Sequence, residues 1–211
     1  MTPTIWRDGQ GFWWVLYDST KPGRGPFETR EEAEAAVTPR DNPPPGEAEV
    51  ERIYTVCLAV DPGPEESAYV EIGKCGTLIM AHKAANERLL EYIRCRVSRG
   101  TLVIEQIAAM GMSVGAEVFE TVFWSGRFAE AFGMEKVARV KRHEVKMHLC
   151  GNTRAKDGNI RQAIIDRYGP GKEKAIGNKK KPGPLHGVSG DCWQALAAGL
   201  TWLDKSVTPP A

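Results

Sequence analysis

Residues 53–63 read IYTVCLAVDPG, and this stretch decides the fold that the chain can adopt. The apolar run from Val56 to Val60 is closed by turn residues, which is typical of a strand buried on both faces of a sheet. Asp61 stands where this strand leaves the core, directly before a Pro-Gly turn. A carboxylate held there is a good first ligand for a hard metal ion. Asp is also an ordinary turn residue at the end of a strand.

Two more acids occupy comparable positions in the sequence. Residues 101–106, TLVIEQ, predict a second buried strand that ends near Glu105, and Asp191 opens the last predicted helix, SGDCWQALAAGL. If the two strands are parallel neighbours, Asp61 and Glu105 lie at the same end of the sheet, where ligands bind in open α/β folds. An Asp at the start of a helix is also a common cap.

Three carboxylates gathered at one sheet edge would repel one another unless a cation neutralises them. An oxygen-only site favours Mg²⁺ or Mn²⁺ over zinc. Two such ions ~4 Å apart can activate a water and stabilise the leaving oxygen in phosphodiester hydrolysis. The acids Asp61, Glu105 and Asp191 are therefore the predicted catalytic and metal-binding residues.

The order of predicted elements indicates an α/β fold. Buried or alternating patterns predict strands at 53–61, 68–72, 76–81, 101–106 and 137–140, and helical spacing predicts helices at 84–97, 114–132, 143–149, 159–168 and 190–203. We expect a mixed sheet with an antiparallel edge and helices on both faces. Residues 65–67 are predicted as a turn and 172–187 as a long, mobile loop. Val118, Val122, Phe128 and Phe132 are the apolar residues of the amphipathic helix 114–132.

A separate small unit is predicted at residues 1–45, ahead of a main domain at 50–205. It contains a strand at 13–17, a loop at 21–26 and a capping box, Thr29 to Glu32, that opens a short helix. The proline-rich residues 41–47, DNPPPGE, predict a linker. No chemistry is assigned to this unit.

Composition is that of a soluble cytoplasmic protein. The chain of 211 residues is 42% hydrophobic, has a formal net charge of +1, and contains no apolar run near the ~18 residues of a membrane span. Its first residues lack the features of a signal peptide. Five scattered cysteines without a CxxC pair argue against a disulfide framework and a zinc site.

Basic residues are concentrated in one segment. Residues 136–186 contain fourteen Lys or Arg against four acids, which suggests a face for phosphates. We expect Arg142, Arg154, Arg161 and the trio Lys179, Lys180 and Lys181 to contact DNA, although the trio also fits a solvated loop. Acids for metal and bases for a phosphate backbone are what a metal-dependent nuclease needs. An actin-like ATPase is a weaker interpretation, since no second Gly-rich phosphate loop is present, and no nucleotide cofactor is expected.

The motifs DPG, VIEQ, VKMHLCGNTRAKDGNIRQAI and GDCWQALAAGL, in this order, resemble the RuvC-type Holliday-junction resolvases of the ribonuclease H-like superfamily, especially their phage-borne relatives. The resemblance covers roughly residues 54–203. It implies a five-stranded ribonuclease H-like sheet, two Mg²⁺ or Mn²⁺ ions per site, and a homodimer that cuts branched double-stranded DNA as a crossover junction endodeoxyribonuclease. Asp61 and Glu105 match the family's first two metal ligands, and Lys146 and Lys156 match basic positions that the family uses on DNA.

One position departs from the family pattern. The last helix of these enzymes presents Asp or His, two further residues, and then Asp; Asp191 matches the first of this pair and Gln194 the second. Gln194 offers a carbonyl oxygen without charge. Asp157 and His186 are candidate substitute ligands. Asp157 also fits a cap of the helix that begins near residue 159, and His186 also fits an ordinary loop residue. The alternative function is a structure-selective DNA-binding protein of the same fold with a weakened or inactive metal site.

Overall fold

The computed structural model describes residues 4–7, 13–16, 24–32, 55–95, 100–108 and 115–207. The chain divides into two compact units, Met1–Gly46 and Glu47–Ala211, and each is described by itself. Within the described ranges, no helix combines the length and the apolar character that crossing a bilayer requires.

The N-terminal unit contains a three-stranded antiparallel sheet. Its strands are β1 (Thr4–Arg7), β2 (Trp13–Leu16) and β3 (Arg24–Phe27), in the order β1-β2-β3. β2 confirms the predicted strand. The predicted loop at 21–26 is wrong at residues 24–26, which belong to β3, and residues 21–23 lie outside the described residues.

A capping box begins the following helix, as predicted. Thr29 Oγ1 accepts a hydrogen bond from the Glu32 amide at 3.2 Å, and Glu32 Oε2 accepts one from the Thr29 amide at 3.3 Å. The rest of the predicted helix and the predicted linker at 41–47 lie outside the described residues.

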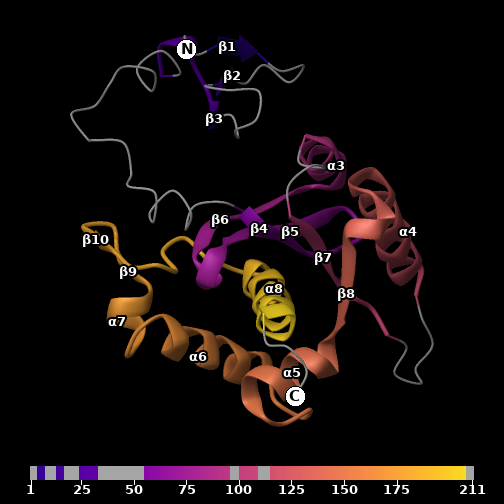
Figure 1. The fold of residues 1–211 in the computed structure, drawn as a ribbon, viewed down its shortest axis with the longest axis vertical. Coiled ribbons are helices and arrows are strands. Elements are labelled where there is room, and N and C mark those ends of the chain that lie inside the picture. Colours follow the sequence, from indigo (N-terminus) through magenta and orange to yellow (C-terminus); the bar gives the residue numbers. More distant parts are fainter. Residues whose placement is uncertain are drawn as a thin grey trace. The chain divides into compact units, whose positions relative to one another are not determined.

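The main unit is built on a mixed five-stranded sheet with the order β6-β5-β4-β7-β8 (Figure 1). Its strands are β4 (Thr55–Asp61), β5 (Glu66–Gly73), β6 (Leu78–Ala85), β7 (Thr101–Gln106) and β8 (Val137–Lys141). β4 pairs antiparallel with β5 and parallel with β7, while β5–β6 is antiparallel and β7–β8 parallel. The predicted α/β fold with an antiparallel edge is confirmed.

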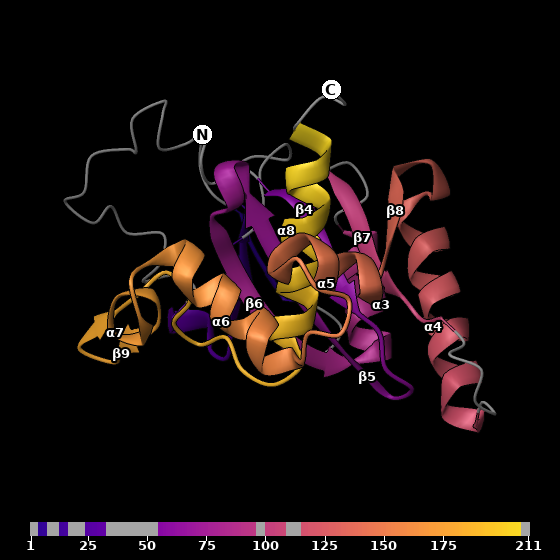
Figure 2. The same cartoon turned by 90° about the horizontal axis from the view of Figure 1, so that it is seen from below.

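Helices cover both faces of this sheet (Figure 2). They are α3 (Asn86–Arg94), α4 (Ala116–Phe132), α5 (Arg142–Cys150), α6 (Asp157–Tyr168), α7 (Lys172–Ala175) and α8 (Cys192–Val207), with short 3-10 turns η1 (Lys74–Gly76) and η2 (Met134–Lys136). One core joins the sheet to α5, α6 and α8; the other joins it to α3 and α4.

The central strand β4 contributes to both cores, as its apolar run predicts. Cys57 and Ala59 pack on the α8 side, whereas Leu58 and Val60 pack on the α3–α4 side. α8 lies close against the sheet at Gly199, where an added Cβ would come within 2.8 Å of the Ala59 side chain. This close packing determines where the first turn of α8 stands relative to the end of β4.

Parts of the predicted turn at 65–67 and of the predicted loop at 172–187 are regular elements in the structure. Glu66, predicted in a turn, is the first residue of β5, because it pairs with Ala85, the last residue of β6. The predicted loop at 172–187 contains α7 and a hairpin of β9 (Gly177–Asn178) and β10 (Lys181–Pro182). Ala175 and Leu185 are completely buried and anchor this segment in the core.

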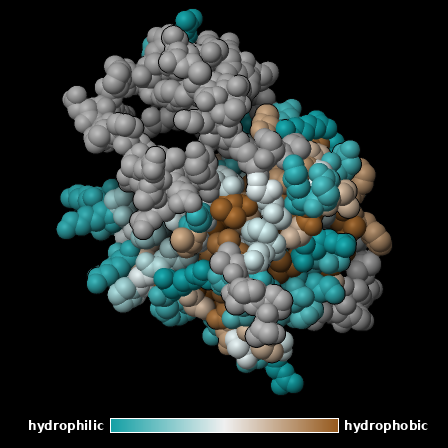
Figure 3. Space-filling model, in the orientation of Figure 1, coloured by the Kyte–Doolittle hydropathy of each residue, from teal (hydrophilic) through white to brown (hydrophobic). Residues whose placement is uncertain are grey.

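The buried face of α4 differs in part from the prediction. Phe128 and Phe132 are buried, as their spacing predicts, but Val122 is 54% exposed. Phe119 and Phe123 are also exposed, by 65% and 59%. The helix buries Thr121 and Trp124 in line with Phe128 instead. Figure 3 shows apolar residues at the surface on the flank where Figure 1 draws α4.

Candidate active site

Asp61 and Glu105 lie at the same edge of the sheet. Val60 of β4 is paired in parallel register with Ile104 of β7, so the acid that follows each residue reaches the carboxyl end of its strand beside the other. Asp191 directly precedes α8, which packs across β4. Glu105 and Asp191 lie near enough to Asp61 for their charges to raise its pKa.

The turn after Asp61 is held by hydrogen bonds from two other segments. The Gly63 amide donates to Ser67 Oγ at 3.1 Å, and Asn86 Nδ2 donates to the Gly63 carbonyl at 3.0 Å. Ser67 and Asn86 are buried and joined by a 2.6 Å hydrogen bond. A Cβ at position 63 would lie 2.3 Å from the Glu66 carbonyl oxygen, so the turn requires glycine. These contacts orient the end of β4 and with it Asp61.

Asp61 is in an environment that disfavours its charge. Burial raises the pKa of Asp61 to about 7, helped by the negative charges of Glu105 and Asp191 and opposed by Arg142 and Lys83. Within the described part of the chain, no basic side chain is hydrogen-bonded to Asp61. The carboxyl group therefore takes up a proton near neutral pH unless a cation comes to it.

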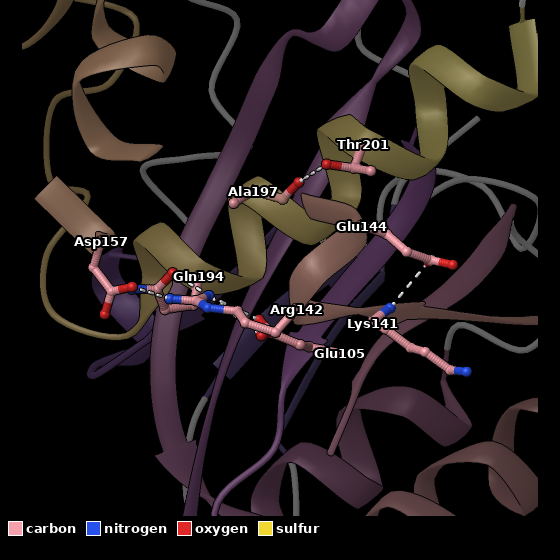
Figure 4. A network of polar contacts seen from close by, with 8 residues as sticks. All are labelled: Glu105, Lys141, Arg142, Glu144, Asp157, Gln194, Ala197 and Thr201. Carbon is pink, nitrogen blue, oxygen red and sulfur yellow. Dashed lines mark hydrogen bonds and ion pairs between the residues drawn. The ribbon is translucent and has the colours of Figure 1, made fainter. Parts of the chain in front are cut away.

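Glu105, in contrast, has a cationic partner. Arg142, the first residue of α5, places Nη1 3.2 Å from Glu105 Oε1 and 3.3 Å from Oε2 (Figure 4). Burial still raises the pKa of Glu105, although the Arg142 charge and hydrogen bond act to lower it. Sequence reasoning expected Arg142 on DNA; that contact stays a prediction, and the structure adds its contact with the acids.

Gln194 and Asp157 meet the same guanidinium. Arg142 Nη1 donates to Gln194 Oε1 at 2.5 Å, and Nη2 donates to Asp157 Oδ1 at 2.5 Å. The cap role considered for Asp157 is wrong: α6 begins at Asp157 itself, and Asn159 Oδ1 accepts the Lys156 amide at 2.9 Å. Asp157 lies near enough to Glu105 for its charge to raise the Glu105 pKa.

His186 stands apart from this group. It is exposed in the turn between β10 and α8, and its amide donates to the Gly183 carbonyl at 3.0 Å. Among the described residues, no contact joins its side chain to Asp61, Glu105 or Asp191.

Asp191 is held by a lysine that sequence reasoning did not single out. Lys83 Nζ, from β6, lies 2.9 Å from Asp191 Oδ2 and 3.7 Å from Glu66 Oε2. Lys83 and Asp191 are separated by more than half of the chain, and no motif connects them. The pair forms because β6 ends beside the start of α8.

A cleft of about 330 Å³ opens next to the acids. Its lining residues are Asp61, Glu105, Gln106, Ile107, Ala108, Arg142, His143, Lys146 and Thr153. Lys146, one of the two lysines matched to DNA-contacting positions, is thus on the wall that faces Asp61 and Glu105. The other, Lys156, immediately precedes α6 and Asp157.

The remaining predicted DNA-binding residues lie further along the surface. Arg154 and Arg161 are exposed, and the Arg161 guanidinium stacks 4.7 Å above the Trp193 ring. Lys179, Lys180 and Lys181 are on the β9–β10 hairpin, which Figures 1 and 2 place at the far end of α6 from α5. The hydrophilic flank in Figure 3 corresponds to this end.

The donor chemistry of the site fits a hard divalent ion, but its ligands are partly engaged. Across the described residues, no three His, Cys, Asp or Glu side chains converge as a ready-made metal site. Arg142 and Lys83 are hydrogen-bonded to Glu105 and Asp191, whereas no basic side chain in the described part of the chain is hydrogen-bonded to Asp61. An ion at Asp61 would have to compete with these two cations for the other carboxylates.

No protein-family model and no curated protein matches this chain. Solved structures do. RuvC from Thermus thermophilus matches 69% of this chain and 91% of its own, with 17% identity and a TM-score of 0.47. T. thermophilus RuvC in complex with a Holliday junction substrate matches 70% of this chain and 92% of its own, with 17% identity and a TM-score of 0.50. The likeness to the second structure shows that the main unit has a RuvC-like, ribonuclease H-like fold.

Proposed function

We propose that this chain is a Mg²⁺- or Mn²⁺-dependent endonuclease that cuts branched DNA such as Holliday junctions. The observation that carries the proposal is the position of Asp61: a partly buried carboxyl at the carboxyl edge of two parallel strands, near enough to Glu105 and Asp191 for their charges to raise its pKa. The cleft beside it has Arg142 and Lys146 in its wall, which suits a phosphate backbone. The RuvC-like fold supports the same reading.

Each group has a part in this proposal. Asp61, with oxygens from Glu105 and Asp191, would hold the ion. Lys146 in the wall of the cleft and Lys156 before α6 would hold the DNA backbone. A divalent ion bound there supplies Lewis-acid stabilisation of the phosphate and a more acidic water. Arg154, Arg161 and the lysines of the β9–β10 hairpin would extend the contact along a DNA arm.

A second candidate is a DNA-binding protein of the same fold that does not cut. It is favoured by Gln194, which brings no charge, and by the ion pairs that Arg142 and Lys83 make with Glu105 and Asp191. If these cations keep the acids from an ion, the basic residues can still hold a junction.

The two candidates separate in one assay. The wild-type chain is incubated with a four-way junction, each strand labelled in turn, in Mg²⁺, in Mn²⁺ and in EDTA; linear duplex of the same sequence is the matched substrate control. The nuclease proposal expects ion-dependent nicks in opposing junction strands and few in the duplex. Shifted bands without nicks in either ion would establish the binding protein instead. Nicks that persist in EDTA would contradict metal dependence.

We also propose that the chain acts as a homodimer. A dimer would cover the exposed apolar side chains Phe119, Val122 and Phe123 on α4. Sedimentation of the wild type and of the double variant Phe119→Glu/Phe123→Glu tests this. We expect the wild type to be a dimer and the double variant to be a monomer. A wild type that remains monomeric at tens of micromolar would contradict it. Because the sequence motifs resemble phage-borne resolvases, the proposed substrates are phage recombination or replication intermediates in the host cytoplasm.

A further inference from the structure

A single guanidinium contacts oxygen acceptors from three elements of the fold. Arg142 at the start of α5 contacts Glu105 of β7, Gln194 of α8 and Asp157 of α6, at 2.5 to 3.3 Å (Figure 4). Two carboxylates and one amide carbonyl around one cation are also the donor set that a hard divalent ion collects. The guanidinium therefore lies among oxygen atoms that are chemically suited to a metal. We call this group, Glu105, Gln194 and Asp157 around Arg142, the Arg142 corner or Glu105 corner, and the surroundings of Asp61 the Asp61 corner.

Gln194 is suited to this partner. An amide oxygen accepts a hydrogen bond from a guanidinium as readily as a carboxylate oxygen does, but it offers a divalent ion no charge. Arg142 and Glu105 are shielded from water, with side chains 29% and 11% exposed, which strengthens their attraction. Arginine keeps its charge at every pH of interest, so this corner always holds a cation.

The Asp61 corner is different. Among the described residues no basic group donates a hydrogen bond to Asp61, and Arg142 and Lys83 act on it through their charge alone. A divalent ion is therefore expected to bind at Asp61, and not at Glu105, Gln194 and Asp157, where the Arg142 guanidinium already lies.

We propose that Arg142 takes the position of a second cation, so that each site binds one divalent ion, at Asp61, in place of the two that the family resemblance implies. This inference rests on the proposed function. Gln194 and Arg142 together replace an acid and its ion. The uncharged Gln194 stands where the family pattern has an acid, and the Arg142 guanidinium lies where the ion bound to that acid would be.

The test is a count of bound ions. Free Mn²⁺ is measured by electron paramagnetic resonance while the full-length chain, without DNA, is titrated at pH 8. We expect one Mn²⁺ per chain for the wild type and two for Arg142→Ala/Gln194→Asp, which removes the guanidinium and restores the acid. Arg139→Ala, a matched change of an exposed arginine on β8, should still bind one. Circular dichroism and thermal unfolding establish that each variant is folded.

The outcomes distinguish this inference from the proposed function. Two ions bound by the wild type would overturn the role of Arg142 and leave a nuclease that cuts junctions intact. One ion bound by a folded double variant would overturn it as well. No bound ion together with no cleavage would overturn the proposed function itself. The wild-type count decides even if the double variant does not fold.

Discussion

Asp61 and Glu105 lie at the carboxyl ends of the neighbouring parallel strands β4 and β7, yet their two carboxylates have different surroundings. Both are largely removed from water, and burial is the main cause of a raised pKa for each. Glu105 is hydrogen-bonded to Arg142 at 3.2 Å, whereas no basic group in the described ranges is hydrogen-bonded to Asp61.

This difference separates two ways of stabilising acids at a sheet edge. Glu105 receives its cation from the protein itself, so its corner is preformed. Among the described residues, Arg142 and Lys83 act on Asp61 by charge and no basic group is hydrogen-bonded to it, so it must take a proton or an ion from solution. A corner of the second kind is where a divalent ion gains most by binding.

The largest expected effect on the Glu105 side is on cleavage. Glu105→Gln removes a charged oxygen donor and leaves Arg142 without its main buried partner. We expect junction cleavage in Mg²⁺ to fall by about 10²–10³-fold, as for other losses of a transition-state contact. Single-turnover rates on a labelled junction measure the loss. Glu130→Gln, an exposed acid of α4, is the matched control and should leave the rate unchanged; equal rates for both variants would remove Glu105 from the site.

The Asp61 side has the opposite signature in stability. Its folded pKa of about 7 lies above the unfolded value of 3.8, so the folded state keeps a proton that the unfolded state has lost. The wild type therefore loses stability as pH rises from about 4 through 7. In EDTA at pH 8, we expect Asp61→Asn to raise the free energy of unfolding by about 2 kcal/mol. The gain should shrink at pH 5. Urea unfolding at both pH values measures it, and a destabilised variant at pH 8 would contradict the unpaired state of Asp61.

Removing the cation from the Glu105 corner should act in the other direction. Arg142→Ala leaves the carboxylate of Glu105 buried without its partner, and we expect the free energy of unfolding at pH 8 to fall by about 1–2 kcal/mol. Arg139→Ala should change it by less than about 0.5 kcal/mol. If urea unfolding gives the two variants the same stability, the contrast between the two corners disappears.

The smallest effect concerns DNA contacts next to the contrasted acids. Lys156→Ala removes one phosphate contact beside the Arg142 corner, and we expect junction affinity to fall by about 1 kcal/mol and the salt slope of binding by about one. Arg94→Ala on α3 is the control, because α3 packs on the other face of the sheet. Gel shifts over a range of salt concentrations measure both. Loss of binding in Arg94→Ala but not in Lys156→Ala would indicate that DNA binds on the α3 face of the sheet and would contradict the proposed contact at Lys156.

Much of the fold could be predicted because the relevant patterns are local. The apolar runs before Asp61 and Glu105 give the central strands, and the edge of the sheet follows from their parallel order. The helix patterns predict α3 to α8 within a few residues, apart from the short α7. In the segment at 172–187, Ala175 and Leu185 are buried in the core that also contains residues of α6 and α8, and the Leu185 amide donates to the Ala175 carbonyl at 2.8 Å. No local pattern could reveal that.

The cations of the site were not predictable in the same way. Lys83 meets Asp191 across 108 residues of sequence, and Arg142 meets Gln194 across 52. The sequence shows that Arg142 belongs to a basic segment, but it could not show that the side chain is hydrogen-bonded to Glu105, Gln194 and Asp157. The exposed residues of α4 were missed because helical spacing gives a face for Phe128 but does not say how far that face extends.

The most direct test of the account compares the wild type with Asp61→Asn on the same four-way junction in Mg²⁺. We expect the variant to lose cleavage by at least about 10³-fold, while its junction affinity, measured by gel shift, stays within a few-fold of the wild type. Full cleavage by Asp61→Asn would show that this carboxylate does not hold the ion on which cleavage depends.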